Sequence, residues 1–461
     1  MEENDLIAAL GTALGEAAIS IIRLSGPEAV DLGASIFKPR KKNLDLLDVD
    51  SHTVNLGYIC DNDGQMLDEV LLCVMRAPRT YTREDVVEIY CHGGVLPAKR
   101  VLDLVLEKGA RLADPGEFTK RAFLSGRIDL TQAEGVLDLI RAHNSKGADL
   151  ACQQLTGKAA QGIGFLRDEL KGLLAQIEAE MDFPEDVDSV PKEERLEQID
   201  GLLERVEIYL QGASLGRVYR EGLKTVLVGK PNVGKSTLLN MLLGEERALV
   251  TEIPGTTRDV IEEMIVISGI PLRIVDTAGI RESVGLVEAL GIDRAREELE
   301  QSDLVVAIFD VSSEVTAEDM LILDLIKGKN GIILLNKIDL DKQVIDTEKI
   351  RDYTQGRFPI IEISSKLGWG RRELADAILN VVGAGQISSE SVLLTRKRHQ
   401  ISMEKVKDRL DSAASAIAGE LPLEFIAVDL WDTWSALGEI TGDTLSEEII
   451  ETIFSDFCVG K

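Results

Sequence analysis

The hydrophobic residues of this chain follow two kinds of pattern, one typical of buried strands and one typical of amphipathic helices. Short apolar runs predict strands at 223–228, 272–276, 331–335 and 360–363. Apolar residues at helical spacing predict long helices at 166–181, 194–210, 395–417 and 446–457. Nearer the start, β-like runs at 53–59, 69–75 and 85–90 alternate with turns and are followed by a helical stretch at 96–107. The predicted fold is therefore multidomain α/β, with a helical part interrupted by a strand-rich part.

The segment after the predicted strand 223–228 matches a phosphate-binding P-loop. It reads Gly-Lys-Pro-Asn-Val-Gly-Lys-Ser at 229–236 and leads into a helical stretch, which is the setting this motif requires. Its glycines allow a tight turn whose N–H groups face an anion. Lys235 is expected to reach the β- and γ-phosphates, and the Ser236 hydroxyl to bind magnesium. The sequence therefore predicts a nucleotide site.

Three later segments predict that the nucleotide carries guanine. Asp276-Thr277-Ala278-Gly279 ends a strand, where a carboxylate can hold the outer shell of the metal and the glycine lets an N–H approach the γ-phosphate. Asn336-Lys337-Ile338-Asp339 ends the next strand, and the Asp339 carboxylate can accept the N1–H and N2–H₂ of guanine. Adenine offers neither donor, so such a site can discriminate by ~10⁴ or more. Ser364-Ser365-Lys366 resembles the loop that closes over the base.

The segment at 255–259, Gly-Thr-Thr-Arg-Asp, lies where a GTPase places its first switch. A threonine there, Thr257, is expected to complete the magnesium shell when the γ-phosphate is present. After Gly279 the chain has Ile280, which cannot orient a water molecule. Glu282 and Glu288 are candidates for that role, and both can also be interpreted as solvated carboxylates at a helix start.

Together with several other segments, these motifs resemble the MnmE family of tRNA modification GTPases, of the TrmE-Era-EngA type, along essentially the whole chain. The further segments that carry the resemblance are 23–26, 88–94, 115–123 and the terminal Phe-Cys-Val-Gly-Lys at 457–461. One difference is visible at 11–20, where the family usually has a glycine-rich stretch and this chain reads Gly-Thr-Ala-Leu-Gly-Glu-Ala-Ala-Ile-Ser.

The resemblance implies a potassium-dependent mechanism for GTP hydrolysis. A potassium ion beside the phosphates supplies the charge that an arginine supplies in other GTPases. Its ligands are Asn232 and the backbone carbonyls of Thr251, Ile253 and Thr256, while Ser236 and Thr257 bind magnesium. Glu288, not Glu282, then orients the attacking water, with Lys235 as the other catalytic residue. The full predicted nucleotide site is Asn232, Val233, Gly234, Lys235, Ser236, Thr237, Thr251, Glu252, Ile253, Pro254, Gly255, Thr256, Thr257, Asp276, Thr277, Ala278, Gly279, Asn336, Lys337, Asp339, Ser364, Ser365 and Lys366.

The resemblance also implies a folate site near the start of the chain. The folate is 5-formyltetrahydrofolate or methylenetetrahydrofolate, bound at a site shared across a homodimer. The predicted contacts are Arg23, Glu88, Arg127 and Lys461. Cys458 is expected to place a thiol near the one-carbon carrier; the alternative is a buried thiol that packs as a small hydrophobe.

Composition restricts the partners and the compartment. The 461 residues include 51 basic and 80 acidic ones, a net charge of −29, which disfavours bulk binding to RNA. The best local basic patch is 396–399, which can equally be an ordinary solvated helix face. Five cysteines without a cysteine-rich segment indicate a reducing cytoplasm. We expect neither a membrane span, since no run of ~18 apolar residues occurs, nor a signal peptide, since the first residues are acidic.

The predicted domains are a folate-binding and dimerisation domain at 1–118, a helical domain at 119–216 and 385–461, and an inserted Ras-like GTPase domain at 217–384. The predicted function is potassium-stimulated GTP hydrolysis that serves tRNA modification. With an MnmG-type FAD protein in a heterotetramer, the chain would add an aminomethyl or carboxymethylaminomethyl group at carbon 5 of the wobble uridine of tRNA. Two alternatives are a GTP-switched RNA-binding or ribosome-assembly factor without chemistry of its own, and a folate-binding scaffold whose GTPase is vestigial.

Overall fold

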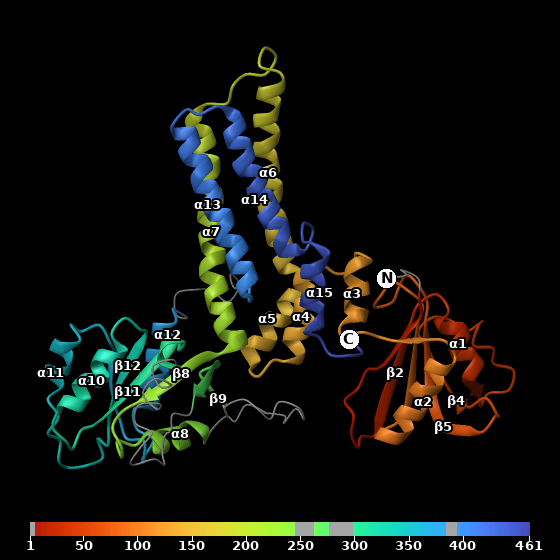
Figure 1. Ribbon diagram of the computed structural model, residues 1–461, viewed down its shortest axis with the longest axis horizontal. Coiled ribbons are helices and arrows are strands. Elements are labelled where there is room, and N and C mark those ends of the chain that lie inside the picture. Colours follow the sequence, from red (N-terminus) through yellow and green to blue (C-terminus); the bar gives the residue numbers. More distant parts are fainter. Residues whose placement is uncertain (1–4, 245–261, 276–297, 384–393) are drawn as a thin grey trace. The chain divides into compact units, whose positions relative to one another are not determined.

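The computed structural model describes residues 5–244, 262–275, 298–383 and 394–461 (Figure 1). The chain forms two compact units, each built from segments that are distant in sequence. The first unit contains residues 1–137, 155–163 and 438–461, and the second contains 138–154 and 164–437. Each unit is treated separately below.

The first unit is built around a mostly antiparallel sheet. Among the described residues its strand order is β3-β4-β5-β6-β2-β1-β7. Helix α2 buries Ala98, Val101, Leu104 and Val105 on one face, at the spacing of an amphipathic helix packed on a sheet. The elements are β1 (Ile7–Leu10), β2 (Ile19–Ser25), α1 (Ala29–Ile36), β3 (Phe37–Pro39), β4 (Thr53–Cys60), β5 (Met66–Met75), β6 (Val86–His92), α2 (Val95–Glu107) and β7 (Arg111–Leu112).

Helices from the middle and the end of the chain complete the first unit. They are α3 (Glu117–Leu124), α4 (Leu130–Ile140) and α15 (Glu447–Ser455). Leu130 and Leu137 of α4 share a small core with Ile450 and Phe454 of α15 and with Phe457. This core lies directly before the last four residues, and it therefore fixes the position of the C-terminal segment.

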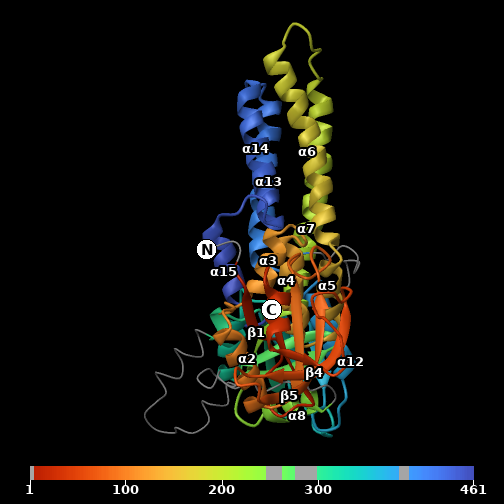
Figure 2. The same cartoon turned by 90° about the vertical axis from the view of Figure 1, so that its right-hand side faces the viewer.

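The second unit contains a bundle of long helices. These are α5 (Ser145–Leu155), α6 (Lys158–Asp182), α7 (Lys192–Glu221), α13 (Lys397–Ala418) and α14 (Leu423–Thr441), of which α6 and α14 extend into the first unit. Lys407 Nζ of α13 lies 2.7 Å from Glu207 of α7, and Trp431 Nε1 of α14 donates to Glu178 of α6 at 3.0 Å. Figures 1 and 2 both show α6, α7, α13 and α14 side by side. The predicted packing of the two helical blocks is therefore confirmed.

A second sheet lies between α7 and α13 in the sequence. Its order among the described residues is β13-β12-β11-β8-β10-β9, parallel except for β9. All of β12 is buried, which explains its uninterrupted apolar run. The elements are β8 (Leu223–Val228), α8 (Lys235–Leu243), β9 (Glu262–Ile267), β10 (Ile270–Val275), β11 (Leu304–Asp310), α10 (Ala317–Ile326), β12 (Gly331–Asn336), α11 (Thr347–Tyr353), β13 (Ile360–Ile363) and α12 (Arg371–Val381).

The predicted fold class is confirmed, while the basic patch at 396–399 is not a single exposed surface. Arg396 pairs with Asp138 at 2.7 Å, and His399 is completely buried. Arg396 directly precedes α13 and its side chain is turned toward Asp138, while His399 falls on the packed face of the helix, so only part of the segment meets solvent. Of the helices in the described ranges, none combines the length and the apolar character needed to cross a membrane.

Candidate functional site

The P-loop connects β8 to α8, as its sequence predicts. Lys235 begins the helix, and its Nζ donates to the carbonyl oxygens of Gly229 and Lys230 at 2.5 and 2.8 Å. Asn232 is exposed and has a left-handed backbone with φ of 66°, a conformation that asparagine tolerates better than most residues. The loop therefore presents Lys235 and the α8 N-terminus together, as phosphate binding requires.

Asn336, at the end of β12, joins the P-loop to the predicted base-binding loop. Its side chain is buried; Nδ2 donates to Val233 O at 2.8 Å, and Oδ1 accepts from Ser365 N–H at 3.0 Å. The approach to Gly234 is so close that an added Cβ would lie 2.2 Å from Asn336 Nδ2, and Gly234 has φ of +107°. Only glycine fits there, so the two loops are held at a fixed separation.

The base-reading residues are oriented by local hydrogen bonds. Asp339 Oδ1 accepts from Ser364 Oγ at 2.6 Å. Lys337 Nζ lies 2.6 Å from Asp310 Oδ2. Burial acts to raise the pKa of Asp310, but hydrogen bonds from Lys337 and Ser312 outweigh it and lower the pKa below its ordinary value. Lys337 is thereby held against an ionised carboxylate at the end of β11.

The residues brought together fit a magnesium nucleotide. In the described part of the chain, the buried Ser365 Oγ has no hydrogen-bond partner, which leaves a polar atom for a ligand beside the base-reading loop. Ser236, in the first turn of α8, supplies a hydroxyl oxygen, the donor type that magnesium prefers. The structure thus groups the predicted residues at 232–237, 336–339 and 364–366. The remaining predictions lie outside the described residues: Thr251, Glu252, Ile253, Pro254, Gly255, Thr256, Thr257, Asp276, Thr277, Ala278, Gly279, Ile280, Glu282 and Glu288.

The second predicted site lies in the first unit, on the face shared by β2 and β6. Arg23 and Glu88 are register partners on these strands, and both Nε and Nη2 of Arg23 lie 2.8 Å from Glu88 Oε1. Tyr90 O–H donates to the other oxygen of Glu88, Oε2, at 2.6 Å. Burial, with the hydrogen bond to Glu88 and its charge, raises the pKa of Tyr90 above its usual value. Tyr90 therefore stays protonated and fixes the carboxylate.

The C-terminal motif reaches this pair. Arg23 Nη1 donates to Gly460 O at 3.3 Å, and Gly116 N–H donates to Cys458 O at 3.3 Å. Gly460 is buried with φ of +91°, and an added Cβ would lie 2.4 Å from Leu10 O. The segment 458–461 thus threads against β1 beside Arg23. Cys458 itself is exposed, so the alternative of a buried packing thiol is wrong.

Arg23 and Arg127 each lie against an aromatic ring. Its guanidinium lies 5.7 Å from the centre of the buried Phe118 ring, and the Arg127 guanidinium lies 4.8 Å from that of Tyr81. Tyr81 and Phe118 belong to one small core. The two arginines and the Glu88 carboxylate can hydrogen-bond a ligand that carries carboxylate groups or a polar heterocycle. The backbone N–H of Lys461 donates to Cys458 O at 3.3 Å.

Sequence reasoning missed Tyr90, Tyr81 and Phe118. Tyr90 follows Glu88 by two residues on a strand, so the two side chains share a face, and that spacing could have identified it. Tyr81 and Phe118 carry no local signal, because only the tertiary fold places them beside the arginines.

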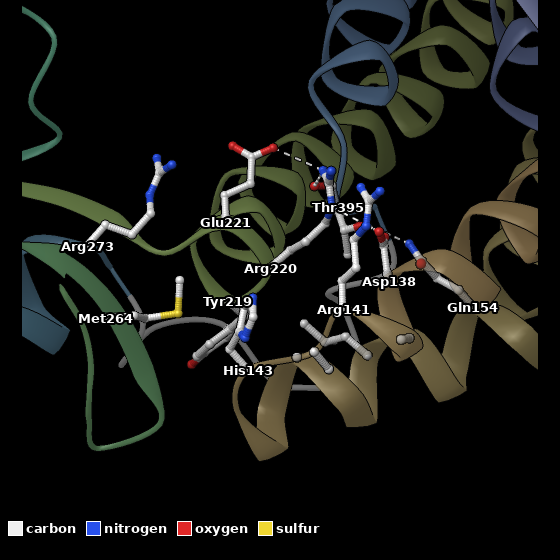
Figure 3. Close-up of a pocket in the computed structure, with 14 residues that line it drawn as sticks. Asp138, Arg141, His143, Gln154, Tyr219, Arg220, Glu221, Met264, Arg273 and Thr395 are labelled. Atoms are coloured by element: carbon white, nitrogen blue, oxygen red, sulfur yellow. Dashed lines mark hydrogen bonds and ion pairs between the residues drawn. The ribbon is translucent and has the colours of Figure 1, made fainter. Parts of the chain in front are cut away.

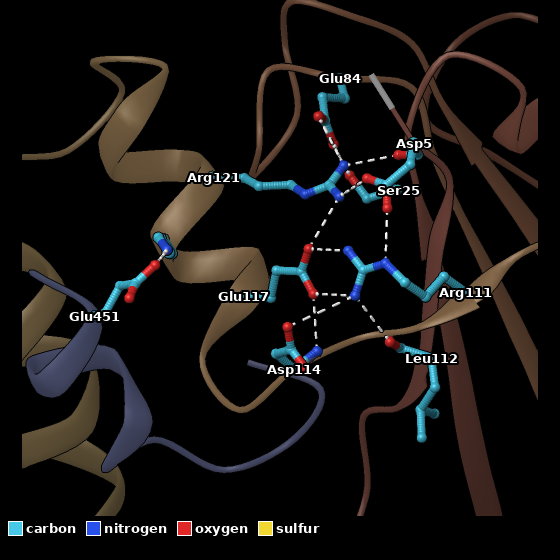
Figure 4. A network of polar contacts seen from close by, with 10 residues as sticks. Asp5, Ser25, Glu84, Arg111, Leu112, Asp114, Glu117, Arg121 and Glu451 are labelled. Atoms are coloured by element: carbon cyan, nitrogen blue, oxygen red, sulfur yellow. Dashed lines mark hydrogen bonds and ion pairs between the residues drawn. The ribbon is translucent and has the colours of Figure 1, made fainter. Parts of the chain in front are cut away.

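A network of ion pairs holds the Pro-Gly-Glu-Phe segment at 115–118 (Figure 4). The buried Glu117 accepts from Arg111 Nη2 at 2.5 Å, from Arg121 Nη2 at 3.0 Å and from Asp114 N–H at 2.8 Å. Burial acts to raise the pKa of Glu117, but these hydrogen bonds outweigh it and lower the pKa. Because Gly116 contacts Cys458, the network also positions the C-terminal motif.

A cavity of about 250 Å³ in the second unit is lined by side chains that connect neighbouring segments of the chain (Figure 3). On its wall, Asp138 Oδ1 lies 3.0 Å from Arg220 Nε and 2.7 Å from Arg396 Nη2. Arg220 precedes the strand-rich segment and Arg396 follows it. The buried Asp138 carboxylate therefore binds both chain segments that connect the helices to the second sheet.

Cysteine and histidine form no metal cluster in the part of the chain that is described. Cys91 is buried and His92 is exposed, on opposite faces of β6, as the alternation of a strand predicts. His92 Nδ1 lies 2.7 Å from Asp68 Oδ1.

Known proteins resemble the chain over nearly its full length. Residues 130–458 match the family model of the MnmE helical domain, and residues 6–127 match that of the GTP-binding protein TrmE N-terminus. The tRNA modification GTPase MnmE of Desulforamulus reducens is 46% identical over 463 residues, covering 99% of this chain and 100% of the relative. That of Bacillus subtilis is 44% identical over 462 residues, with coverage of 99% and 100%.

The G domain of the T. maritima FeoB iron transporter aligns with 34% of this chain and 98% of its own length, at 26% identity and a TM-score of 0.27, too low to argue a shared fold. The two family models together match residues 6–127 and 130–458, and the relatives align over nearly the whole of both chains. The chain therefore belongs to the MnmE family of tRNA modification GTPases.

Proposed function

We propose that this chain is a potassium-stimulated GTP hydrolase that acts with an FAD-containing, MnmG-type protein on tRNA. Together they would add an aminomethyl or carboxymethylaminomethyl group at carbon 5 of the wobble uridine. The observation that carries the proposal is Asn336, which hydrogen-bonds both the P-loop and the loop at 364–366. A site with phosphate and base recognition tied together is built to bind one nucleotide in one orientation.

Within this proposal the ions complete the nucleotide site. Ser236 and Thr257 bind magnesium, and Asn232 with the backbone carbonyls of Thr251, Ile253 and Thr256 binds potassium. When bound, these cations offset the negative charge that develops on the phosphates. Lys235 contacts the β- and γ-phosphates, and Glu288 orients the attacking water. Asp339 recognises guanine, and Ser364 holds its carboxylate in position.

The folate site is proposed at Arg23, Glu88, Arg127 and Lys461, with 5-formyltetrahydrofolate or methylenetetrahydrofolate as the one-carbon source. The ion pair of Arg23 with Glu88 and its contact with Gly460 support this site. The exposed Cys458 is the proposed thiol near the one-carbon group. We also propose that the chain forms a homodimer through residues 1–118 and works in the cytoplasm.

The proposed domain arrangement is a folate domain at 1–118, a helical domain at 119–216 and 385–461, and a GTPase domain at 217–384. Asp138 supports the insertion of the GTPase domain into the helical domain, since it binds Arg220, which precedes the first strand β8 of the inserted domain, and Arg396, which follows the domain.

Potassium dependence tests the hydrolysis mechanism. We expect GTP turnover of the full chain to rise strongly when potassium replaces sodium at constant ionic strength. Asn232→Ala should flatten this response while GDP binding persists, because Asn232 contributes a single ligand on an exposed part of the loop. Equal rates of GTP hydrolysis in both salts would contradict the potassium assignment.

Mass spectrometry of wobble nucleosides tests the role in tRNA modification. A deletion strain should lack the carbon-5 modification, and the wild-type chain should restore it. A strain with unchanged wobble nucleosides would instead favour a GTP-switched assembly factor.

A further inference from the structure

The end of the helical bundle where α6 meets α7 and α13 meets α14 carries exposed apolar side chains. We call this surface the bundle tip and define it as residues 182–194 and 418–425. Lys192 Nζ joins its two loops, since it donates to Ala418 O at 2.7 Å and lies 3.4 Å from Glu420 Oε1. Figures 1 and 2 both show the two loops at the same end of the bundle.

Large hydrophobic side chains are unusually open at the bundle tip. Phe183 is 58% exposed, Leu421 is 50% exposed and Phe425 is 61% exposed. On α14 the pattern continues away from the tip with Val428 at 60% and Trp431 at 48%, and the spacing of 425, 428 and 431 places these three on one side of the helix, which Leu421 precedes. Single exposed apolar residues are ordinary, but a continuous row of them indicates a binding surface.

Phe183 and Phe425 both lie near the tip end of the bundle. Phe183 directly follows α6, which ends at Asp182, and Phe425 lies in the first turn of α14, which begins at Leu423. Trp431 Nε1 donates to Glu178 at 3.0 Å, so α14 packs against α6. Both phenylalanines lie on the tip side of this contact, where a partner bound at the tip would meet them.

Charge at the bundle tip restricts that partner. The 21 residues contain eight acidic side chains and one basic one, a net charge of −7, whereas the whole chain has 80 acidic residues in 461. The acidic share is thus about twice that of the chain. The six acidic residues at 182, 185, 186, 188, 420 and 424 are all exposed. Such a surface repels a phosphate backbone, so nucleic acid is disfavoured, and it attracts a basic protein surface.

We propose that the bundle tip is the docking site for a protein partner that presents apolar side chains within a basic surface, and that this partner is the flavoprotein of the proposed function. The assignment rests on that function, because the flavoprotein is the protein partner it requires. Helix α7 separates the tip from the GTPase sheet, since it begins at Lys192 and ends at Glu221, before β8. Its 30 residues span roughly 45 Å, so tip residues do not touch the nucleotide site.

Binding of purified full-length chain to the purified flavoprotein encoded by the same genome tests the proposal. Phe183→Ser with Phe425→Ser should weaken binding by about tenfold or more, since apolar anchors dominate interface energies. Asp182→Asn, Glu185→Gln, Asp186→Asn and Asp188→Asn together should weaken it by about fivefold and reduce its dependence on salt. This second variant keeps every apolar contact, so it tests the surface even if the first folds poorly.

Matched controls use residues of α7 away from the tip. Ile208→Ser removes an apolar side chain that is 51% exposed, and Asp200→Asn with Glu204→Gln removes exposed charges. These variants should bind as the wild type does, and all variants should keep basal GTP hydrolysis.

Any other outcome contradicts the proposed docking site. Wild-type affinity in both tip variants rejects the site but leaves the partner of the proposed function intact. A wild-type chain that does not bind the flavoprotein rejects that partner and this site together. Tip variants that change the oligomeric state of the chain alone would assign the surface to a second copy, and loss of tRNA binding without loss of flavoprotein binding would assign it to RNA.

Discussion

The nucleotide site and the proposed folate site of this chain are built in opposite ways. The nucleotide site is made of short contiguous motifs at strand ends, and its main link is a single side chain, Asn336, between two loops. The site around Arg23 is assembled from β2, β6 and the last residues of the chain, which are 437 positions away from Arg23 at Gly460. A site of the first kind depends on local backbone geometry, whereas the second depends on how the C-terminus docks.

This difference predicts that variants in one site should leave the other untouched. Variants of the nucleotide site should change GTP binding or turnover while folate binding persists. Variants of the C-terminal contact should change folate binding and wobble modification while GTP hydrolysis persists. The following predictions run from the largest expected effect to the smallest.

Glu288→Ala should lower GTP turnover by ~10² or more with GTP affinity nearly unchanged, the pattern for a group that acts in the transition state. Single-turnover hydrolysis and equilibrium binding measure the two quantities. Glu282→Ala is the matched control and should lower GTP turnover far less. If the two variants exchange their effects, the water-orienting carboxylate is Glu282.

Asn336→Ala should weaken GTP binding by about tenfold. It leaves the buried Val233 carbonyl and Ser365 N–H without their partner, at about 1–3 kcal/mol each. Titration calorimetry with GDP and GTP measures the change, and folate affinity is the internal control. A variant that binds both nucleotides normally would show that the two loops keep their separation without this link.

Gly460→Ala should weaken folate binding by about tenfold with normal GTP hydrolysis. The added Cβ would meet Leu10 O at 2.4 Å, at a position with φ of +91°, so the C-terminal segment has to move away from Arg23. Fluorescence or calorimetric titration with 5-formyltetrahydrofolate measures it.

Cys458→Ser provides the control for that experiment. The Cys458 side chain is exposed, and its backbone carbonyl makes the contact with Gly116. Folate affinity should therefore stay normal in this variant. Wobble modification should fall if the thiol takes part in the one-carbon step, and normal modification would restrict Cys458 to its backbone role.

Tyr90→Phe should weaken folate binding by about threefold, because it removes the hydrogen bond to Glu88 Oε2 while Arg23 still holds Oε1. Since the pKa of Tyr90 is raised above its ordinary value, the wild-type hydroxyl keeps its proton throughout pH 6–9, and the difference between the two proteins should be constant over that range. A difference that changes with pH would point to another titrating group.

Sequence by itself determined the parts of this protein that depend on local spacing. The strands at 223–228 and 360–363 were predicted with the bounds that the structure has, since buried parallel strands are short uninterrupted apolar runs. The P-loop was predicted equally well, because its glycines, Lys235 and Ser236 all lie in one short contiguous segment. Resemblance of sequence also predicted that Arg23, Glu88 and Lys461 belong to one folate site, and the structure brings Arg23 into contact with Glu88 and Gly460.

Only the tertiary structure decided which residues surround that site and which surfaces stay open. Tyr81 and Phe118 lie beside Arg127 and Arg23 because a small core packs their rings together, and no spacing along the chain encodes that contact. The basic run at 396–399 was undecided in sequence, and helix packing against Asp138 turned Arg396 inward. Periodicity shows which face of a helix is apolar, but whether that face is covered depends on neighbours brought together by folding, as the exposed row on α14 demonstrates.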